Sequence, residues 1–313
     1  MEIPFDEHYR VLKSGCGLVD RAAAGRLELL GADRHRFLNA YVTCDVKGLA
    51  PGHGAYGFFT SAQGRILSDA VVLALEDRLW VELPAGQDEA IAAHLKKYLL
   101  ADRVELRGLD DQAPLALVGP ESAAVLGDAA PPEGEWRHHR TTFWGLEVTV
   151  VRDGRFGVLA FTLWTDATEL PRLKEALRAS TVEVGPEALD MARVEAGVPW
   201  FGRDFGPDNF PQETGLEAAV SYTKGCYLGQ EVVARIHYRG GVQKILRTLA
   251  FEPGQEPAPG TVLTYEDREA GVCGTVVGSP AHGHPIGLAI LHKRAAEPGT
   301  RLQFTGGEAV VLA

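Results

Sequence analysis

The order of strand-like and helix-like segments limits the folds open to this chain more than any other feature of its sequence. Paired β runs followed by helical segments recur twice, at about residues 55–127 and 143–197. This order lacks the strict alternation of strand and helix that a doubly wound sheet requires, so it favours an α+β fold. After residue 240 short β runs follow one another, separated by Pro, Gly or Asp. We therefore predict two similar α+β units and a C-terminal β-barrel.

Apolar spacing assigns the individual segments. Predicted helices cover residues 88–100, 169–180 and 185–199, and a further one follows Asp33, which is a plausible N-cap. Residues 113–127 predict a strand, a Gly-Pro turn and a short helix, and residues 128–135 predict a surface loop. The other predicted strands cover residues 26–30, 70–75, 78–83, 143–151, 156–163, 245–251, 261–265, 271–277, 286–291 and 301–304.

Net charge and cysteine spacing exclude several classes of protein. Forty-two acidic residues against thirty-one basic ones give a formal net charge of -11, so we do not expect direct contact with nucleic acid. The basic segment 235–247 is instead expected to serve a ligand pocket. No apolar run reaches the ~20 residues that a membrane span needs, and the N-terminal residues do not resemble a signal peptide. Four cysteines without a C-x-x-C pair predict reduced thiols, a cytoplasmic protein and no resident metal.

The segment SYTKGCYLGQEVVARIHYRGG, residues 221–241, is the strongest candidate for chemistry. Gly225 and Gly229 flank Cys226, which indicates a tight turn that presents a thiol just before a short helix. Lys224 and the helix N-terminus would favour the thiolate, the form that attacks electrophiles and binds metals. A free cysteine is also a common small apolar residue of protein cores, so a packing role for Cys226 stays open.

A second candidate is Glu195, which follows Arg193 near the end of a predicted helix. A carboxylate at a helix C-terminus is unfavourable against the helix dipole, so we expect a partner that offsets it. Either a ligand with N–H donors or a neighbouring guanidinium could be that partner.

The stretch KGCYLGQEVVAR carries a family resemblance. Its residues match K-G-C-Y-x-G-Q-E, the signature of the YgfZ family of folate-binding proteins, at Lys224, Gly225, Cys226, Tyr227, Gly229, Gln230 and Glu231. The upstream runs ARVEAGVPWFG and FPQET resemble YgfZ and its relative, the glycine cleavage T-protein, an aminomethyltransferase that uses tetrahydrofolate. The resemblance covers nearly the whole chain.

This resemblance implies a ring of three domains with a reduced folate in the central hole. The expected domains are residues 1–46 with 152–240, residues 47–151, and the barrel at residues 241–313. In the T-protein the glutamate of the R-x-E-A-G run binds the pterin, and the matching residue in this chain is Glu195. Asp69 keeps one acid of a T-protein pair, whereas Ser68 replaces the other. Arg247 would meet the folate tail, and Tyr227 would line the pocket.

The resemblance also implies a function. The YgfZ family is linked to assembly or repair of iron–sulfur enzymes and to tRNA modification that depends on them. The leading hypothesis is a tetrahydrofolate-binding accessory protein whose partners are iron–sulfur enzymes or their assembly machinery, with Cys226 as the functional thiol. Two alternatives remain open, a folate-dependent aminomethyltransferase and a folate-binding module without catalysis.

Overall fold

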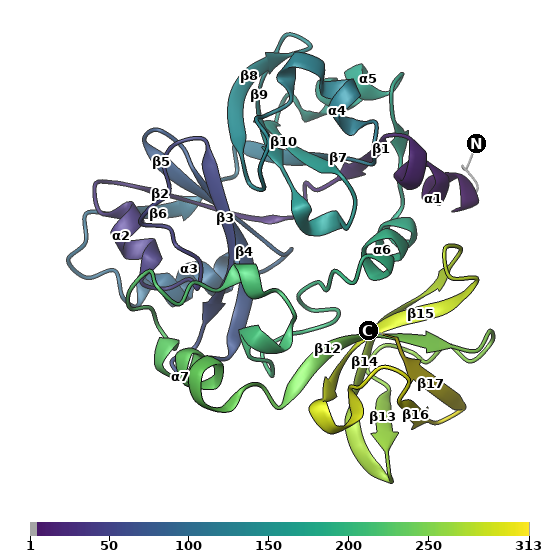
Figure 1. The fold of residues 1–313 in the computed structure, drawn as a ribbon. Coiled ribbons are helices and arrows are strands. Elements are labelled where there is room, and N and C mark those ends of the chain that lie inside the picture. Colours follow the sequence, from purple (N-terminus) through teal and green to yellow (C-terminus); the bar gives the residue numbers. More distant parts are fainter. Residues whose placement is uncertain (1–4, 313) are drawn as a thin grey trace.

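Two β-sheet units and a barrel make up the computed structural model, which describes residues 5–312. Figure 1 shows the three parts placed around a central region, with the barrel at the C-terminal end of the chain. The predicted α+β fold with a C-terminal barrel is confirmed. Within the described residues, none of the helices combines the length and the apolar character needed to cross a membrane.

The β2–β6 unit is a five-stranded sheet with two helices packed on one face. Its strands lie in the order β3-β4-β5-β2-β6. Phe37 and Leu38 of the first helix and Ile91 and Leu95 of the second join one apolar core with the sheet. The unit comprises β2 (Gly25–Leu30), α2 (Arg34–Asn39), β3 (His53–Thr60), β4 (Ile66–Ala74), β5 (Arg78–Leu83), α3 (Asp88–Lys96) and β6 (Glu105–Gly108).

The β7–β11 unit is a six-stranded sheet in the order β11-β1-β7-β10-β9-β8. Leu126, Leu173 and Leu177 from its helices α4 and α5 pack into the core on one face. The unit comprises α1 (Phe5–Ser14), β1 (Gly17–Asp20), β7 (Gln112–Val118), α4 (Ser122–Leu126), β8 (His138–Phe143), β9 (Leu146–Arg152), β10 (Ala160–Asp166), α5 (Leu170–Leu177), β11 (Val182–Glu183) and α6 (Pro186–Glu195).

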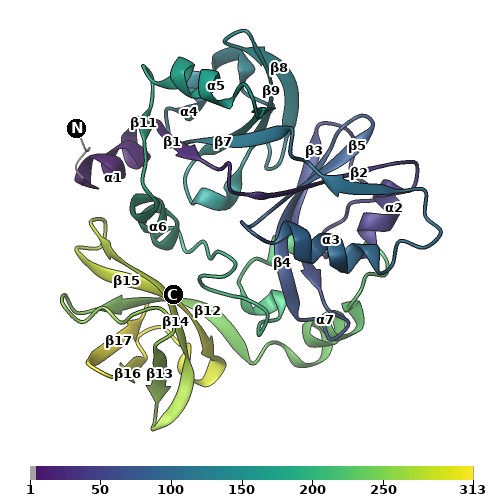
Figure 2. The same ribbon diagram turned by 180° about the vertical axis from the view of Figure 1, so that it is seen from behind.

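The two units repeat one topology. Each runs strand, helix, three-stranded meander, helix, strand, and the third meander strand pairs with the opening strand in both. The β7–β11 unit differs because β1, from the start of the chain, lies between β7 and β11. The uncovered faces of the sheets meet through Val71 and Trp80 on one side and Val151 and Trp164 on the other. Figure 2 shows this meeting from behind.

The sheets divide the chain at points other than the predicted domain boundaries. The β2–β6 unit takes residues 25–108, and the β7–β11 unit takes residues 5–20 with 112–195. Residues 17–18 do pair with residues 182–183, which fits the expected pairing of residues 1–46 with 152–240, but β2 bonds to β5 and β6 rather than to strands after residue 152. The two repeats expected at residues 55–127 and 143–197 also start too late in the chain, because each unit begins one strand and one helix earlier.

Backbone turns explain where the strand predictions shift. The predicted run 143–151 contains Trp144 and Gly145 with φ of 50° and 71°, so β8 ends before them and β9 begins after them. Gly157, with φ of 72°, follows a single 3₁₀ turn, which delays the start of β10 to Ala160. Left-handed backbone of this kind cannot continue a strand.

The barrel closes in the order β12-β15-β14-β13-β16-β17, with Leu249, Leu263, Leu291 and Leu302 fully buried inside. Closure leaves the barrel without a free sheet edge. Its strands are β12 (Lys244–Phe251), β13 (Val262–Tyr265), β14 (Arg268–Ser279), β15 (His284–His292), β16 (Arg301–Phe304) and β17 (Gly307–Val311).

A connecting segment, residues 196–243, returns to the β2–β6 unit before it reaches the barrel. The Ser221 amide donates to the Thr43 carbonyl, and the Leu228 amide donates to the Ala40 carbonyl, each at 2.9 Å. The segment contains the 3₁₀ turns Pro211–Glu213 and Glu217–Ala219, the helix α7 (Gln230–Arg235) and the π-helical turn η5 (Ile236–Gly240).

Arg193 fastens α6 to the barrel. Its fully buried guanidinium donates to Asp190 at 2.8 Å and to Asp204 at 2.6 Å, and also to the Thr275 hydroxyl of β14 at 2.6 Å. Asp204 in turn accepts from the Thr275 amide at 2.8 Å. Because a buried cation needs such partners, this cluster fixes the barrel relative to the sheets.

Candidate functional site

Two adjoining cavities lie where the sheet units meet the connecting segment. Their volumes are about 530 Å³ and 440 Å³, within the range of small-molecule sites. Asp69, Arg155 and Trp200 line both, so the two cavities share a common wall. We call the larger one the central cavity. Its lining includes Tyr56, Asp69, Trp136, Arg155, Pro199, Trp200 and Glu217.

Aromatic side chains form the walls of the central cavity. Tyr56 and Trp136 stack with ring centroids 5.9 Å apart and an interplanar angle of 15°. The Trp200 indole donates to the Arg155 carbonyl at 2.9 Å and packs edge-on against Phe156. Such rigid walls suit a flat ligand.

Asp69 is the buried acid of the central cavity. It lies on β4, and the Tyr56 hydroxyl on β3 donates to its Oδ2 at 2.7 Å. Burial raises the pKa of the Asp69 carboxyl, against the opposing effects of Tyr56 and the nearby Arg155. Its proton is therefore held more tightly than that of an ordinary aspartate, as is common in binding sites.

Charged side chains beneath Asp69 are paired with one another. Arg155 binds both oxygens of Asp153, and its Nη2 also lies 2.8 Å from Glu82. Arg21 contacts the same Glu82 oxygen at 2.6 Å. Burial would raise the pKa of Asp153, but Arg155 and Arg21 lower it to about 2. The cations Arg155 and Arg21 thus balance the anions Asp153 and Glu82, and Asp69 is a further acid close to this cluster.

Glu135 lines the central cavity as well as Asp69, and Glu217 places a third carboxyl group there. Glu217 is exposed, and within residues 5–312 its carboxylate makes neither a hydrogen bond nor an ion pair. Sequence reasoning missed this residue, although GLEAAV repeats the Glu-Ala pair of VEAGV. That repeated pair was the available signal.

Glu195 is not among the residues that line the two adjoining cavities. Its side chain is 4% exposed and forms an ion pair with Lys13 at 2.6 Å. Tyr9 donates to both carboxylate oxygens at 2.9 Å, and the Ser279 hydroxyl donates to Oε1 at 2.6 Å. The predicted helix-end partner therefore exists, but it comes from α1 and the β14–β15 turn. Both carboxylate oxygens thus already have donors within residues 5–312.

Arg247 and Tyr227 also lie away from the central cavity. The Arg247 guanidinium donates to the carbonyls of Ala296 and Leu246 within the barrel region. Tyr227 is buried with Phe58, Ile66 and Val233 in an apolar cluster of the β2–β6 unit. Neither residue lines the central cavity. Of the predicted binding residues, only Asp69 does.

Most residues of the 224–231 motif attach the connecting segment to the β2–β6 unit. Lys224 donates to the Asn39 carbonyl, and burial lowers the pKa of its ammonium to about 8. Gly229 has φ of 84°, and a Cβ there would collide with the Ser61 carbonyl oxygen. Gln230 accepts from the Tyr227 amide at 3.3 Å and opens α7, so the motif includes a tight turn as predicted.

Cys226 stands apart from these attachments. It is the exposed cysteine, whereas Cys16, Cys44 and Cys273 are buried. Burial raises the pKa of the Cys44 thiol to about 12, although Lys224 opposes this effect. Cys226 is not among the residues that line the central cavity, whereas the family resemblance places it beside the folate pocket.

The model of the GCVT N-terminal domain matches residues 3–224, more than half of the chain. The chain belongs to the GCVT family. The resemblance to YgfZ and to the aminomethyltransferases, expected from the motif, is thereby confirmed. The fold agrees, since this chain superimposes on a glycine cleavage system aminomethyltransferase T from Bartonella henselae with a TM-score of 0.87. That match covers 98% of this chain and 88% of the other at 23% identity.

Curated relatives of this GCVT-family chain carry two kinds of name. An aminomethyltransferase from Saccharopolyspora erythraea is 26% identical over 308 residues, covering 94% of this chain and 84% of that protein. A tRNA-modifying protein YgfZ from Sodalis glossinidius is 29% identical over 245 residues, covering 75% of this chain and 71% of that protein. Both kinds of relative are therefore similar in sequence to this chain over most of their length.

One departure from the T-protein pattern has a structural explanation in this GCVT-family chain. Ser68 is fully buried, and its hydroxyl donates to the Asp69 carbonyl at 3.0 Å. Only Asp69 of the pair reaches the central cavity. The replaced acid thus corresponds to a position without access to that cavity.

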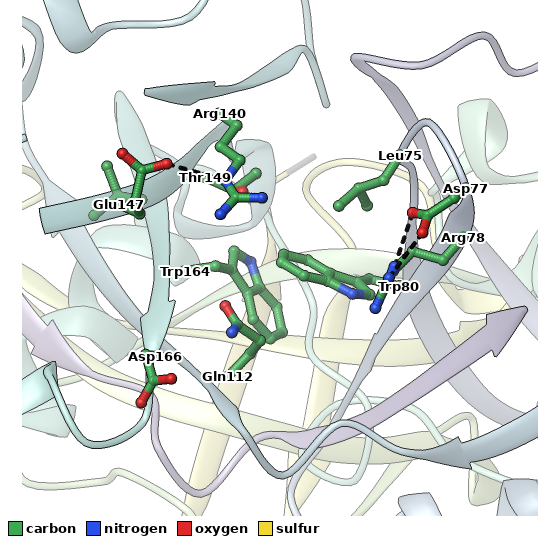
Figure 3. A pocket seen from close by; sticks show the side chains of 11 residues that line it. Leu75, Asp77, Arg78, Trp80, Gln112, Arg140, Glu147, Thr149, Trp164 and Asp166 are labelled. Atoms are coloured by element: carbon green, nitrogen blue, oxygen red, sulfur yellow. Dashed lines mark hydrogen bonds and ion pairs between the residues drawn. The ribbon is translucent and has the colours of Figure 1, made fainter. Parts of the chain in front are cut away.

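A separate cavity of about 420 Å³ lies between the sheets, around Trp80 and Trp164 (Figure 3). Arg78 pairs with Asp77 at 2.8 Å and Arg140 with Glu147 at 3.2 Å, while Asp166 accepts hydrogen bonds from Thr168. The indole rings lie 5.4 Å apart and join the core between the sheets. Because its charges already have partners, this cavity is a weaker candidate than the central one.

Proposed function

We propose that this GCVT-family chain binds a reduced folate in the central cavity. The observation that supports this most strongly is the combination of aromatic walls with Asp69 and the unpaired Glu217. A pterin is flat and edged with N–H groups. The pterin ring would pack against the aromatic wall that the stacked Tyr56 and Trp136 form, and a carboxylate would accept its N–H groups in charge-assisted bonds.

Glu217 takes over the pterin-anchoring role that the family resemblance gave to Glu195. The carboxylate of Glu195 is already engaged by Lys13, Tyr9 and Ser279, so it has no acceptor to offer a ligand. Asp69, whose pKa is raised, would contact the other polar edge of the pterin. Folate would supply one-carbon or reducing chemistry when bound.

We further propose that Cys226 is the functional thiol of an accessory protein for iron–sulfur enzymes. The packing contacts of Lys224, Tyr227, Gly229 and Gln230 account for their place in the motif, and they leave Cys226 exposed without a structural task. An exposed thiol is accessible to a protein client, and a stable cluster needs four ligands. Any iron or cluster fragment would therefore be shared with the client.

Anaerobic titration with tetrahydrofolate tests the folate proposal. Trp136 and Trp200 line the central cavity, so tryptophan fluorescence reports occupancy, and calorimetry gives the Kd. Glu217→Gln and Asp69→Asn should each weaken binding by about 1 to 3 kcal/mol, the usual value for a hydrogen bond to a charged group. Glu195→Gln is the contrasting variant and should leave the Kd within about twofold. A loss confined to Glu195→Gln would overturn the assignment.

Complementation of cells that lack the protein tests the thiol proposal. Cys226→Ser should abolish the rescue of iron–sulfur enzyme activity while tetrahydrofolate binding stays intact. Glu231→Gln, at an exposed position of the same motif, is the matched control. Full rescue by Cys226→Ser would remove the thiol role and favour the plain folate-binding module. Methylene-tetrahydrofolate formation from an aminomethylated lipoyl carrier would instead favour the aminomethyltransferase, for which the retained Asp69 is the supporting residue.

A further inference from the structure

Unpaired cations gather where the connecting segment meets the barrel. Arg235 and Arg239 are exposed, Lys244 is half-buried at the start of β12, and none of them forms an ion pair within residues 5–312. Lys293 of the barrel is exposed and also lacks an ion pair there, and its ammonium lies against Gly241 at the end of η5. Although the chain has a net charge of -11, these cations form a local concentration of positive charge that can attract a polyanion.

Aromatic rings lie among these cations, with His237 and Tyr238 exposed and Tyr222 half-buried. Tyr222 and His237 stack at 3.8 Å with an interplanar angle of 18°, which ties the segment before Cys226 to η5. Tyr238 is 66% exposed, and its ring stands edge-on to His237 at 4.8 Å. The π-helical turn η5 presents these side chains, and π-helical turns are frequent at functional sites.

A hollow of about 300 Å³ continues this surface. Its lining includes the cations Arg65 and Lys244, the acids Asp208 and Glu213, and the apolar Phe210 and Ile236, so it reaches the first residue of η5. The Arg65 guanidinium stacks over the Phe210 ring at 3.8 Å from its centroid. We call these rings, the cations around them and the hollow the basic aromatic surface.

We propose that the basic aromatic surface binds a single-stranded nucleic acid. Cations without protein partners attract phosphates, while exposed rings stack on unpaired bases. An acidic protein segment would use the cations but has no flat rings for Tyr238 and the Tyr222–His237 stack. A duplex keeps its bases stacked inside, so it offers no ring faces either. The expectation of no nucleic-acid contact came from the net charge of the whole chain, and it assigned the basic segment 235–247 to a ligand pocket instead.

Fluorescence anisotropy with labelled twelve-nucleotide uridine and thymidine strands tests the proposal. Wild-type protein should bind at least one strand at 50 mM salt, and a twelve-base-pair duplex at least tenfold more weakly. Arg239→Glu with Lys244→Glu should weaken binding at least tenfold and reduce the salt slope by about 1.4, since two phosphate contacts are lost. The control pair, Arg172→Glu with Arg178→Glu, makes the same charge change on exposed residues of α5 and its C-cap.

Tyr238→Ala separates base stacking from charge. It should weaken binding about fivefold to a hundredfold and leave the salt slope unchanged. The neutral pair Arg239→Gln with Lys244→Gln repeats the charge test if the reversed pair fails to fold. Absence of binding to both strands, an equal loss in the control pair, or binding of polyglutamate that survives Tyr238→Ala would each overturn the proposal.

Discussion

The Tyr56 hydroxyl, in the wall of the central cavity, donates across 2.7 Å to Oδ2 of Asp69, which lines both that cavity and the adjoining one. Burial raises the pKa of Asp69, so the folded protein holds this proton more tightly than the unfolded chain. Stability should therefore fall as the pH rises from the ordinary aspartate value near ~3.9 through the raised pKa. Asp69→Asn should remove this fall and stabilise the protein at pH 7 by about 1 kcal/mol. Urea unfolding at pH 4 and pH 7 measures both.

Glu195→Gln should destabilise the fold by about 1 to 3 kcal/mol, because charged hydrogen bonds to Lys13, Tyr9 and Ser279 are weakened. Burial acts to raise the pKa of Glu195, but these donors lower it overall. Its stabilisation is thus present above the ordinary carboxyl pKa near ~4.3 and is lost as the pH falls through the lowered value. Thermal unfolding between pH 6 and pH 3 should show a steeper decline for wild type than for the variant.

Arg193→Met should cost about 3 to 5 kcal/mol, because it leaves the buried Asp204 without its cation. The loss should appear first as loosening of the barrel, since Arg193 also holds Thr275 of β14. Arg203→Met is the control, because Arg203 is 46% exposed and pairs only with Asp190 within the described residues. Denaturant unfolding and limited proteolysis between α6 and β12 report these changes, and equal effects of both variants would contradict the prediction.

Gly229→Ala should detach the motif from the β2–β6 unit. Both Gly229 and Gly225 have positive φ, but only at Gly229 would a Cβ collide with backbone, at the Ser61 carbonyl. Gly225→Ala meets no atom within 4 Å and should cost only the strain of left-handed backbone, about 1 kcal/mol. Gly229→Ala should cost more than twice as much. Hydrogen exchange of the Leu228 and Gln230 amides localises the effect.

Cys226 should be the single cysteine that reacts in the folded protein. The other three thiols are buried, and burial raises the pKa of Cys16, Cys44 and Cys273. Iodoacetamide at pH 8 should add one carbamidomethyl group, and four after denaturation, by intact-mass spectrometry. Two or more adducts on the folded protein would show that the buried thiols open readily.

Local patterns predicted the elements that carry a strong period. The α5 and α6 segments have apolar residues at helical spacing and a proline in the first turn, and both form. The short strands β1 and β6 have only four residues each, too few to show an alternation, and both were missed. The unit boundaries depended on which strands pair across long stretches of chain, which no local period reports.

The candidate site, like the fold, could be predicted from the sequence only in part. Asp69 was found because a family pattern marked it, whereas Tyr56, Trp136 and Trp200 meet only after β3, β8 and the connecting segment are assembled. Glu195 and Glu217 occur in similar short runs, and only the contacts of Lys13 and Ser279 reveal that one is occupied. Motifs thus indicate residue types, while the long-range packing decides which of them face a ligand.

The place of β1 between β7 and β11 has a consequence for synthesis on the ribosome. The β2–β6 unit is complete once residue 108 has emerged, and it needs no later strand. The strand at residues 17–20 must wait for β7 and then for residues 182–183 before both of its edges are paired. Of the two sheets, the one that contains the start of the chain is therefore completed second. Its β1 has no partner strand until β7 has emerged and keeps one unpaired edge until residue 183 has emerged.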